Sequence, residues 1–354
     1  MNKSYSLLLA VIIALAGGGV FTLLHIPVSW LLGSITSIML YSIISKKTLY
    51  WPKSFRNIGI FIIGYSMGLS LTKEAMVFIL HQLPSMLFLT VLIIGFSLIT
   101  SLLIAKLTGI HYPSILLGSI PGGLSQMLVL AEETKDINVT VVTFLQVVRL
   151  ILIIFFVPFL IFGPFFHNGE NILPTIEKPA SWQQLFPDII PFIILSLILV
   201  IIFKKWKAPT PFLLGPIIAT SLMTLLHING PELPNSLLEI AQVFIGINIG
   251  LMMHPEKLEN KWKLLSLGIF SSALLIVISM MLSFLLSQFY GFSLATSFLS
   301  LSPGGMDQMA IIAHEVDAQL AVVTGYQLFR VFFIFFIVPP CLKLLFSRYR
   351  KEKG

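Results

Sequence analysis

The chain has 354 residues, of which 56% are hydrophobic and 10% are charged, and its formal net charge is +7. A soluble domain carries about 25% charged residues, so this composition excludes a water-soluble fold and indicates an integral membrane protein. Membrane proteins collect Lys and Arg in cytoplasmic loops, so the charge does not indicate nucleic-acid binding, and the single cysteine, Cys341, excludes an intramolecular disulfide.

The first apolar segment, 5–24, follows Lys3 and contains a small-x-small sequence at Ala14 to Ala16, as a signal peptide would. It continues past that sequence and has a counterpart later in the chain, so we interpret it as a retained helix. Further segments show no in/out alternation, which predicts helices rather than barrel strands. The first half contains segments at about 5–24, 28–45, 55–72, 85–107, 113–131 and 138–163, and the second at about 188–203, 210–227, 237–253, 264–287, 293–313 and 319–342.

The two halves are copies of each other. A shift of 182 residues aligns PVSWLLG at 27–33 with PTPFLLG at 209–215, and SIPGGLSQM at 119–127 with LSPGGMDQM at 301–309; after this motif the shift is 181. The predicted parts are a first membrane repeat, an external polar linker, a second membrane repeat and a basic cytoplasmic tail, at 1–163, 164–187, 188–345 and 346–354.

Loop charges predict how the chain crosses the membrane. If every segment crosses, 12 Lys and Arg side chains fall inside and 8 outside; if each Pro-Gly-Gly segment returns to its own side, the counts are 18 and 2. The positive-inside rule favours the second arrangement. We therefore expect an all-α polytopic protein with about ten spans and two broken or re-entrant helices. Its repeats would have inverted topology, with both termini cytoplasmic.

The duplicated Pro-Gly-Gly motif is the main candidate site. Interrupting a helix within lipid leaves backbone groups unbonded, which is tolerated where they are buried in protein or line a cavity, and paired broken helices are typical of secondary transporters. The alternative is a pair of kinks needed only for packing. The candidate residues are Pro121, Gly122, Gly123, Ser125 and Gln126 in the first motif, and Pro303, Gly304, Gly305, Asp307 and Gln308 in the second.

Asp307 differs in charge from Ser125, its counterpart in the first motif. A carboxylate within the membrane is a candidate for H⁺ or Na⁺ binding, and the alternative is a permanent ion pair with an arginine.

The last segment of each half carries a Gln-x-x-Arg pair, formed by Gln146 and Arg149 and repeated as Gln327 and Arg330. Each pair lies on one helical face, so its guanidinium could bind an anionic solute. The alternative is a structural arginine bonded to the free carbonyls of a broken helix. The acidic residues that follow the motifs, Glu133, Asp136, Glu315 and Asp317, fit water-exposed mouths.

Two pairs of glycines, Gly64 with Gly68 and Gly246 with Gly250, have a spacing that predicts close helix packing. The seven histidines show no metal-binding spacing, and no phosphate-binding loop is present, so we expect no enzyme, no metal and no cofactor.

The duplicated PGGLSQM and PGGMDQM, each followed by Glu, Asp and a Gln-x-x-Arg helix, resemble the membrane AbrB-duplication family over essentially the whole chain. Members are labelled AbrB family transcriptional regulator or ammonia monooxygenase. The resemblance implies a bacterial inner-membrane protein. It extends more distantly to inverted-repeat secondary transporters, including antiporters and bile-acid- or auxin-type carriers.

Together these features predict secondary transport of a small solute coupled to H⁺ or Na⁺, with an anionic solute left open. The alternatives are a membrane sensor that regulates gene expression through a partner and, less favoured, a membrane oxygenase. Expected partners are membrane lipid and the solute or ion, without nucleic acid, and a homodimer is left open.

Overall fold

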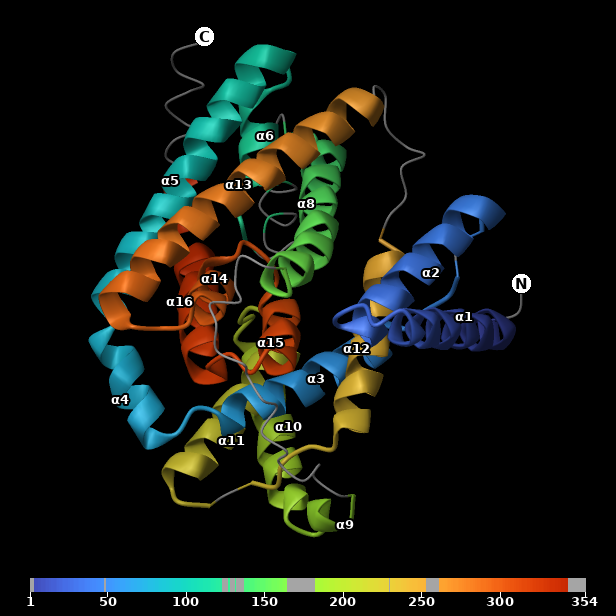
Figure 1. Cartoon of the computed structure of the whole chain (residues 1–354), viewed down its shortest axis with the longest axis vertical. Coiled ribbons are helices and arrows are strands. Elements are labelled where there is room, and N and C mark those ends of the chain that lie inside the picture. The colour runs from blue at the N-terminus through green and yellow to red at the C-terminus, as the bar shows by residue number, and fades with distance from the viewer. Residues whose placement is uncertain are drawn as a thin grey trace. The chain divides into compact units, whose positions relative to one another are not determined.

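The computed structural model describes residues 3–47, 49–122, 127, 131, 137–163, 182–228, 230–252 and 261–342, and these residues form helices and no strand. Figure 1 labels the helices. Their bounds are α1 Lys3–Leu23, α2 Ser29–Ser45, α3 Lys53–Leu69, α4 Lys73–His81, α5 Leu83–Thr108, α6 Tyr112–Ser119, α8 Val139–Ile161, α9 Trp182–Leu185, α10 Ile189–Lys205, α11 Pro211–Leu225, α12 Asn235–Gly250, α13 Lys261–Tyr290, α14 Leu294–Leu301, α15 Met306–Glu315 and α16 Leu320–Phe336.

The length and apolar composition of several helices support a helical membrane-type protein. Four of them, α1, α5, α8 and α13, are long and apolar enough to cross a membrane. A fifth span results if α3 and α4, which are bent by 87° at their break, count as one. The helices α2, α11 and α16 are apolar but shorter. The sequence did not predict α4, because the polar residues at the start of this helix separate the predicted segments 55–72 and 85–107.

The duplication extends to the helix boundaries. Helices α2, α3 and α6 start 182 residues before α11, α12 and α14, and α8 starts 181 residues before α16. The C-terminal ends of α5 and α13 also correspond. Each helix is followed by a glycine with a positive φ angle, 71° at Gly109 and 70° at Gly291. Glycine adopts this left-handed conformation without steric penalty, so both long helices can end in the same way.

The described residues form two compact units, and each unit draws on both halves of the sequence. Unit 1 lies within residues 1–78, 155–254 and 310–321, and unit 2 within 79–154, 255–309 and 322–354. Unit 1 therefore contains the first three helices of each repeat. Unit 2 contains α5, α6, α13, α14 and most of α8 and α16, while α4 and α15 are divided between the two units. This division cuts across the predicted boundary at 164–187, and the repeat boundaries themselves stay a prediction.

Unit 1 is built by exchanging helices between the repeats. Helix α1 packs on α2 and α10 on α11, but α3 packs on α11 while α2 packs on α12. The glycines of the predicted packing motif make these contacts. A Cβ on Gly64 would lie 2.8 Å from the Leu213 carbonyl oxygen, and a Cβ on Gly250 would lie 2.8 Å from that of Ile35. The interpretation of these glycines as packing residues is confirmed.

In unit 2, α5 packs on α6, α13 packs on α14, and α5 contacts α13. All eight residues of α6 are buried. One hydrophobic cluster includes Leu116 and Leu117 of α6 together with Ile334 of α16, and a second includes Leu301 of α14 with Tyr326 of α16. The short helices that lead into the Pro-Gly-Gly motifs are thus enclosed by protein.

Candidate functional site: two capped helix breaks

Both Pro-Gly-Gly motifs interrupt a helix, as predicted. Helix α6 ends at Ser119 and α14 ends at Leu301, and the next residues, Ile120 and Ser302, have extended ψ angles of 127° and 132°. Each of these residues precedes a proline, which sterically disfavours the helical conformation. The interruption is therefore encoded locally and in the same way in both repeats.

The first break is capped by Gln146 and Arg149. The Gln146 Nε2 group donates to the Leu117 and Ile120 carbonyl oxygens at 2.7 and 3.1 Å. The Arg149 Nη1 group donates to the carbonyl oxygens of Gly118, Ser119 and Ile120 at 3.4, 3.0 and 2.8 Å, and its Nη2 donates to Gln146 Oε1. These bonds satisfy carbonyls that the end of an α-helix leaves free.

The second break is capped by the equivalent pair, Gln327 and Arg330. Gln327 Nε2 donates to the Leu299 carbonyl at 2.7 Å and to that of Ser302 at 3.3 Å. Arg330 Nη1 donates to the Leu301 and Ser302 carbonyls at 3.1 and 2.8 Å, and Nη2 donates to Gly304 at 3.3 Å and to Gln327 Oε1. The repeat is therefore visible in the hydrogen bonds.

This geometry matches the structural alternative considered for the arginines. Arg149 and Arg330 are 5% and 4% exposed. Each guanidinium donates hydrogen bonds to backbone carbonyls and to one glutamine. Each terminal nitrogen of the Arg330 fork already donates twice, which leaves its planar pair of donors unavailable for a carboxylate. Arginine side chains stay protonated in proteins, so each break holds a buried positive charge.

The two breaks lie between the same two helices. A Cβ on Gly122 would lie 3.0 Å from Ile334 of α16, and a Cβ on Gly304 would lie 3.1 Å from Ile153 of α8. Helix α8 thus caps the first break and, one turn beyond Arg149, contacts the second; α16 does the converse. A side chain at either glycine would press on these isoleucines, which would have to move by a few tenths of an ångström to admit it.

Among the described residues, four buried oxygen atoms in or next to the helices that form the second break and its cap, α14, α15 and α16, have no hydrogen-bond partner. They are Ser297 Oγ, Ser302 Oγ, Thr324 Oγ1 and Gln308 Oε1, in side chains that are between 0% and 4% exposed. At the first break, Ile115 and Ile120 stand at the positions of Ser297 and Ser302, and Thr143 donates to the Val139 carbonyl. Ser119 Oγ is the unpartnered oxygen found there among the described residues.

Gln308 Oε1 and Asp307 Oδ1 both lie over Gly305. A Cβ on Gly305 would collide with the first oxygen and lie 2.9 Å from the second. Both oxygens belong to the first turn of α15, beside the break. Because Gly305 has no side chain, the side chains of Asp307 and Gln308 can occupy the space next to its Cα atom.

The structure brings most of the predicted site residues together in unit 2. Of the first motif, Gly123, Ser125 and Gln126 lie outside the described residues, as do Glu133 and Asp136. Glu315 and Asp317 are exposed. Sequence reasoning missed Ser297 and Ser302, although the repeat alignment, which pairs each serine with an isoleucine, could have identified them.

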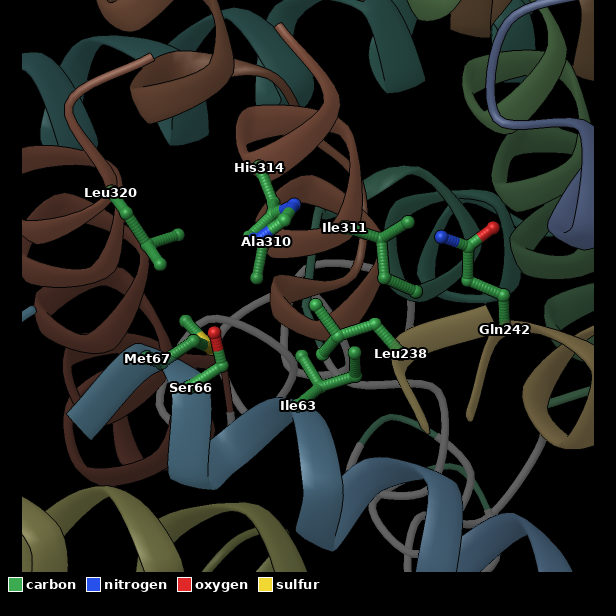
Figure 2. A pocket seen from close by; sticks show the side chains of 9 residues that line it. All are labelled: Ile63, Ser66, Met67, Leu238, Gln242, Ala310, Ile311, His314 and Leu320. Atoms are coloured by element: carbon green, nitrogen blue, oxygen red, sulfur yellow. The ribbon is translucent and has the colours of Figure 1, made fainter. Parts of the chain in front are cut away.

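A small pocket in unit 1 was also missed. Figure 2 shows its lining, to which α3, α12 and α15 all contribute, and it has space for about one water molecule. Gln242 is 3% exposed, and its Nε2 donates to Glu315 Oε1 at 3.1 Å. The lining residues are Ile63, Ser66, Met67, Leu238, Gln242, Ala310, Ile311, His314 and Leu320.

Comparison with known proteins identifies related chains. Residues 30–346 match the family described as "Transition state regulatory protein AbrB". The chain is 24% identical over 375 residues to "Uncharacterized protein YhjN" of Bacillus subtilis (strain 168), covering 96% of this chain and 93% of that protein. It is also 24% identical over 338 residues to "Putative regulator AbrB" of Escherichia coli (strain K12), covering 94% of each.

Proposed function

Because the chain belongs to the AbrB family, whose match includes both helix breaks, we propose that it is a secondary transporter of a small solute. The solute binds at the second break and moves together with H⁺ or Na⁺. The observation that carries this proposal is the group of buried, unpartnered oxygens at Ser297, Ser302, Thr324 and Gln308. Most buried polar groups have partners, so these four oxygens, which have none among the described residues, offer hydrogen-bonding capacity to a ligand at this break.

The buried charges favour an anionic solute. Arg149 and Arg330 bring two positive charges into unit 2, and the hydrogen bonds described above join them to uncharged carbonyl and amide oxygens. An anion near these guanidiniums gains a large electrostatic interaction in a low-dielectric interior. The arginines act through their field while the hydroxyl groups of the second break donate hydrogen bonds to the solute.

The proposal includes the membrane arrangement that the loop charges predict. It has ten spans, the two broken helices and repeats of inverted topology, in the cytoplasmic membrane of a bacterium with both termini inside. Interrupted helices at an interface between inverted repeats are the usual construction of a transporter's binding site. Solute would reach the breaks alternately from the two sides.

Labelling a cysteine in the linker tests this topology. The variant Glu170→Cys in a Cys341→Ser background should react with an impermeant maleimide on intact cells. Reaction only after permeabilisation contradicts the inverted arrangement. The Cys341→Ser chain alone is the control, because Cys341 is an exposed free thiol.

Transport is tested by recording charge movement in proteoliposomes exposed to small carboxylates and inorganic oxyanions, with H⁺ or Na⁺ gradients. The wild type should give a solute-dependent current that Ser302→Ile abolishes, because the hydroxyl is replaced by the residue that the first repeat carries there. Ser196→Ala is the matched control, since Ser196 is equally buried and unpartnered but lies in α10 of unit 1. Because one monovalent anion that moves with one H⁺ or Na⁺ carries no net charge, solute accumulation is measured beside the current, and binding with neither current nor gradient-driven accumulation contradicts transport.

A second candidate function is sensing, in which the solute controls gene expression through a protein partner. This function is favoured by the name of the Escherichia coli relative and by the description of the family, since both refer to regulation. A deletion strain that recovers its wild-type, solute-dependent transcript pattern with a chain that binds the solute but does not transport it would favour partner signalling independent of flux.

We propose no catalytic residue, metal or cofactor. An oxygenase would need a set of metal ligands, and the described ranges contain no group of three or more His, Cys, Asp or Glu side chains placed to hold a metal ion. Bound copper or iron in the purified protein would favour the oxygenase alternative.

A further inference from the structure

The first three helices carry basic side chains and no acidic ones. The first Asp or Glu of the chain is Glu74, which follows α3. Before it, five basic residues stand at or next to the ends of α1, α2 and α3, and all but the last of them are exposed. We call this group the basic corner, and its members are Lys3, Lys46, Lys47, Lys53 and Arg56. No carboxylate within α1, α2 or α3 neutralises these charges.

Contacts within unit 1 bring the basic corner together on one surface. The Lys3 ammonium lies 5.6 Å from the centre of the Tyr50 ring, a cation–π contact. The Tyr50 backbone N–H donates to Ser6 Oγ of α1 at 2.7 Å. Tyr50 belongs to the loop that joins the end of α2 to the start of α3. The start of α1 therefore lies against the loop that carries the other basic residues.

The loop is fixed by buried residues between the basic ones. Leu49 is 6% exposed and belongs to the same hydrophobic cluster as Ile38 of α2. Trp51 stacks on Phe55 with 4.8 Å between ring centres, and its ring meets Phe244 of α12 edge to face at 5.7 Å. The basic side chains are thus held on an ordered backbone. A ligand that binds them pays little for ordering the loop.

Exposed apolar side chains lie next to the basic corner. Ile43 and Ile44 are exposed in the last turn of α2, just before its two lysines, and Tyr5 and Leu8 are exposed in the first two turns of α1. Such side chains face lipid tails in a membrane protein, and lysines at helix ends reach the headgroup level. The surface therefore offers cations beside an apolar face.

From this arrangement we propose that the basic corner binds the phosphate headgroup of an anionic phospholipid, whose acyl chains lie along α1 and α2. Lys and Arg bind phosphate oxygens through charge-assisted hydrogen bonds, and each basic residue near an anionic lipid surface contributes about 1 kcal/mol. A soluble anion would use the cations but not the apolar side chains beside them. This inference is independent of the proposed transport.

The second repeat shows that the fold of this loop does not need the charges. A shift of 182 residues places Tyr50, Lys53 and Arg56 on Glu232, Asn235 and Leu238. The residues before α3 and α12 are both prolines, with ψ angles of 137° and 141°, so the two loops end alike. The positive-inside rule accounts for Lys and Arg on one side of the membrane, but it does not require them to gather at one place.

Thermal unfolding of the purified full-length protein in a neutral detergent tests the site. Phosphatidylglycerol, or phosphatidylcholine with the same acyl chains, is added at equal mole fraction and fixed ionic strength. We expect phosphatidylglycerol to raise Tm by about 2–4 °C more than phosphatidylcholine at concentrations near ten times its Kd, because it binds the folded state. Combining Lys46→Gln, Lys47→Gln and Lys53→Gln should remove most of this difference.

The matched control combines Lys204→Gln, Lys205→Gln and Lys207→Gln. It removes the same charge from three exposed lysines of unit 1, at and after the end of α10, and should keep the difference between the lipids. An equal loss in both triple variants overturns the proposal, because the lipid would then respond only to total charge. An equal Tm of the wild type in the two lipids also overturns it.

Two further measurements separate the remaining outcomes. Inorganic phosphate without added lipid should leave Tm unchanged, and a rise as large as that with phosphatidylglycerol replaces the lipid with a soluble anion. Lys53→Gln alone is a single exposed substitution that does not depend on the folding of the triple variant. In native mass spectrometry it should retain fewer phosphatidylglycerol molecules than Lys204→Gln, and equal retention by these two chains contradicts a site at the basic corner.

Discussion

The two helix breaks share their capping but differ in the polar groups around them. In both, a glutamine and an arginine from the last helix of the repeat bond the carbonyls released at the motif. Around the second break, serines and a threonine without partners stand where the first has isoleucines and a bonded threonine. Features shared by duplicated sequences satisfy the fold, and features that differ are free to serve function.

The largest expected effect comes from removing the shared cap. Arg330→Ala would leave the carbonyls of Leu301 and Gly304 without this donor, and that of Ser302 with Gln327 alone, so we expect a loss of at least about 3 kcal/mol in the free energy of unfolding. Arg149→Ala should cost a similar amount because its bonds are equivalent. Chemical unfolding in mixed micelles, followed by circular dichroism, measures both.

The lysine variants sharpen this prediction. Arg330→Lys keeps the charge but not the planar fork, so it should be less destabilising than Arg330→Ala while still losing some of the bonds. A fully stable and active Arg330→Ala chain contradicts the capping role as well as any role in solute binding.

Exchanging a residue between the breaks should have the next largest effect. Ile120→Ser would remove buried apolar atoms and place an unpartnered hydroxyl in the first break, which should cost about 2–4 kcal/mol. Ser302→Ala should change stability little or increase it, because an unbonded hydroxyl is removed without adding volume to a site that is 0% exposed. If both substitutions destabilise equally, the difference between the breaks reflects packing rather than function.

Glycine contacts in unit 1 should give an intermediate effect. Gly64→Ala and Gly246→Ala would bring a Cβ against the carbonyls of Leu213 and Leu31, at 2.8 and 3.0 Å, with a cost of about 1–3 kcal/mol each. Gly19→Ala is the control, because a Cβ at Gly19 of α1 meets nothing within 4 Å. Thermal unfolding of the three variants should rank Gly19→Ala highest.

The smallest effect on stability is expected at Asp307. Its counterpart is Ser125, so the motif tolerates a neutral side chain there, and Asp307→Asn should change the free energy of unfolding by less than about 1 kcal/mol. It should abolish the dependence of solute current on H⁺ or Na⁺. Wild-type ion dependence in this variant would transfer the coupling to another acid, with Glu133 and Glu315 to be tested next.

The sequence predicts the helices well because their determinants are local. Apolar length, prolines and the 182-residue shift place nearly every helix boundary within a few residues, and Ile120 and Ser302 leave the helical conformation because each precedes a proline. The family resemblance from the doubled motif is also confirmed. The membrane topology, the domain boundaries and the roles of the site residues stay predictions.

What the sequence did not decide depends on long-range contacts. A buried arginine has several chemically reasonable partners, and only the position of α6 relative to α8 selects the carbonyls of Gly118, Ser119 and Ile120 for Arg149. The pocket at Gln242 is lined by four helices, α3, α12, α15 and α16, which come from three separate parts of the chain. No local sequence pattern predicts such a contact between distant helices. The one indication in the sequence is that Gln242 stands where the first repeat has Ile60.

The exchange of partners in unit 1 also determines the order of events during biosynthesis. Helices α2 and α3 pack on α12 and α11, which lie in the second half of the chain. At about 5–20 residues per second, translation delivers these partners roughly ten seconds or more after α3 has left the ribosome. The first half must therefore wait in the membrane with its close-packing glycine faces uncovered. Neither half, made alone, can complete unit 1, and the gene cannot be divided into two independently folding proteins at its line of duplication.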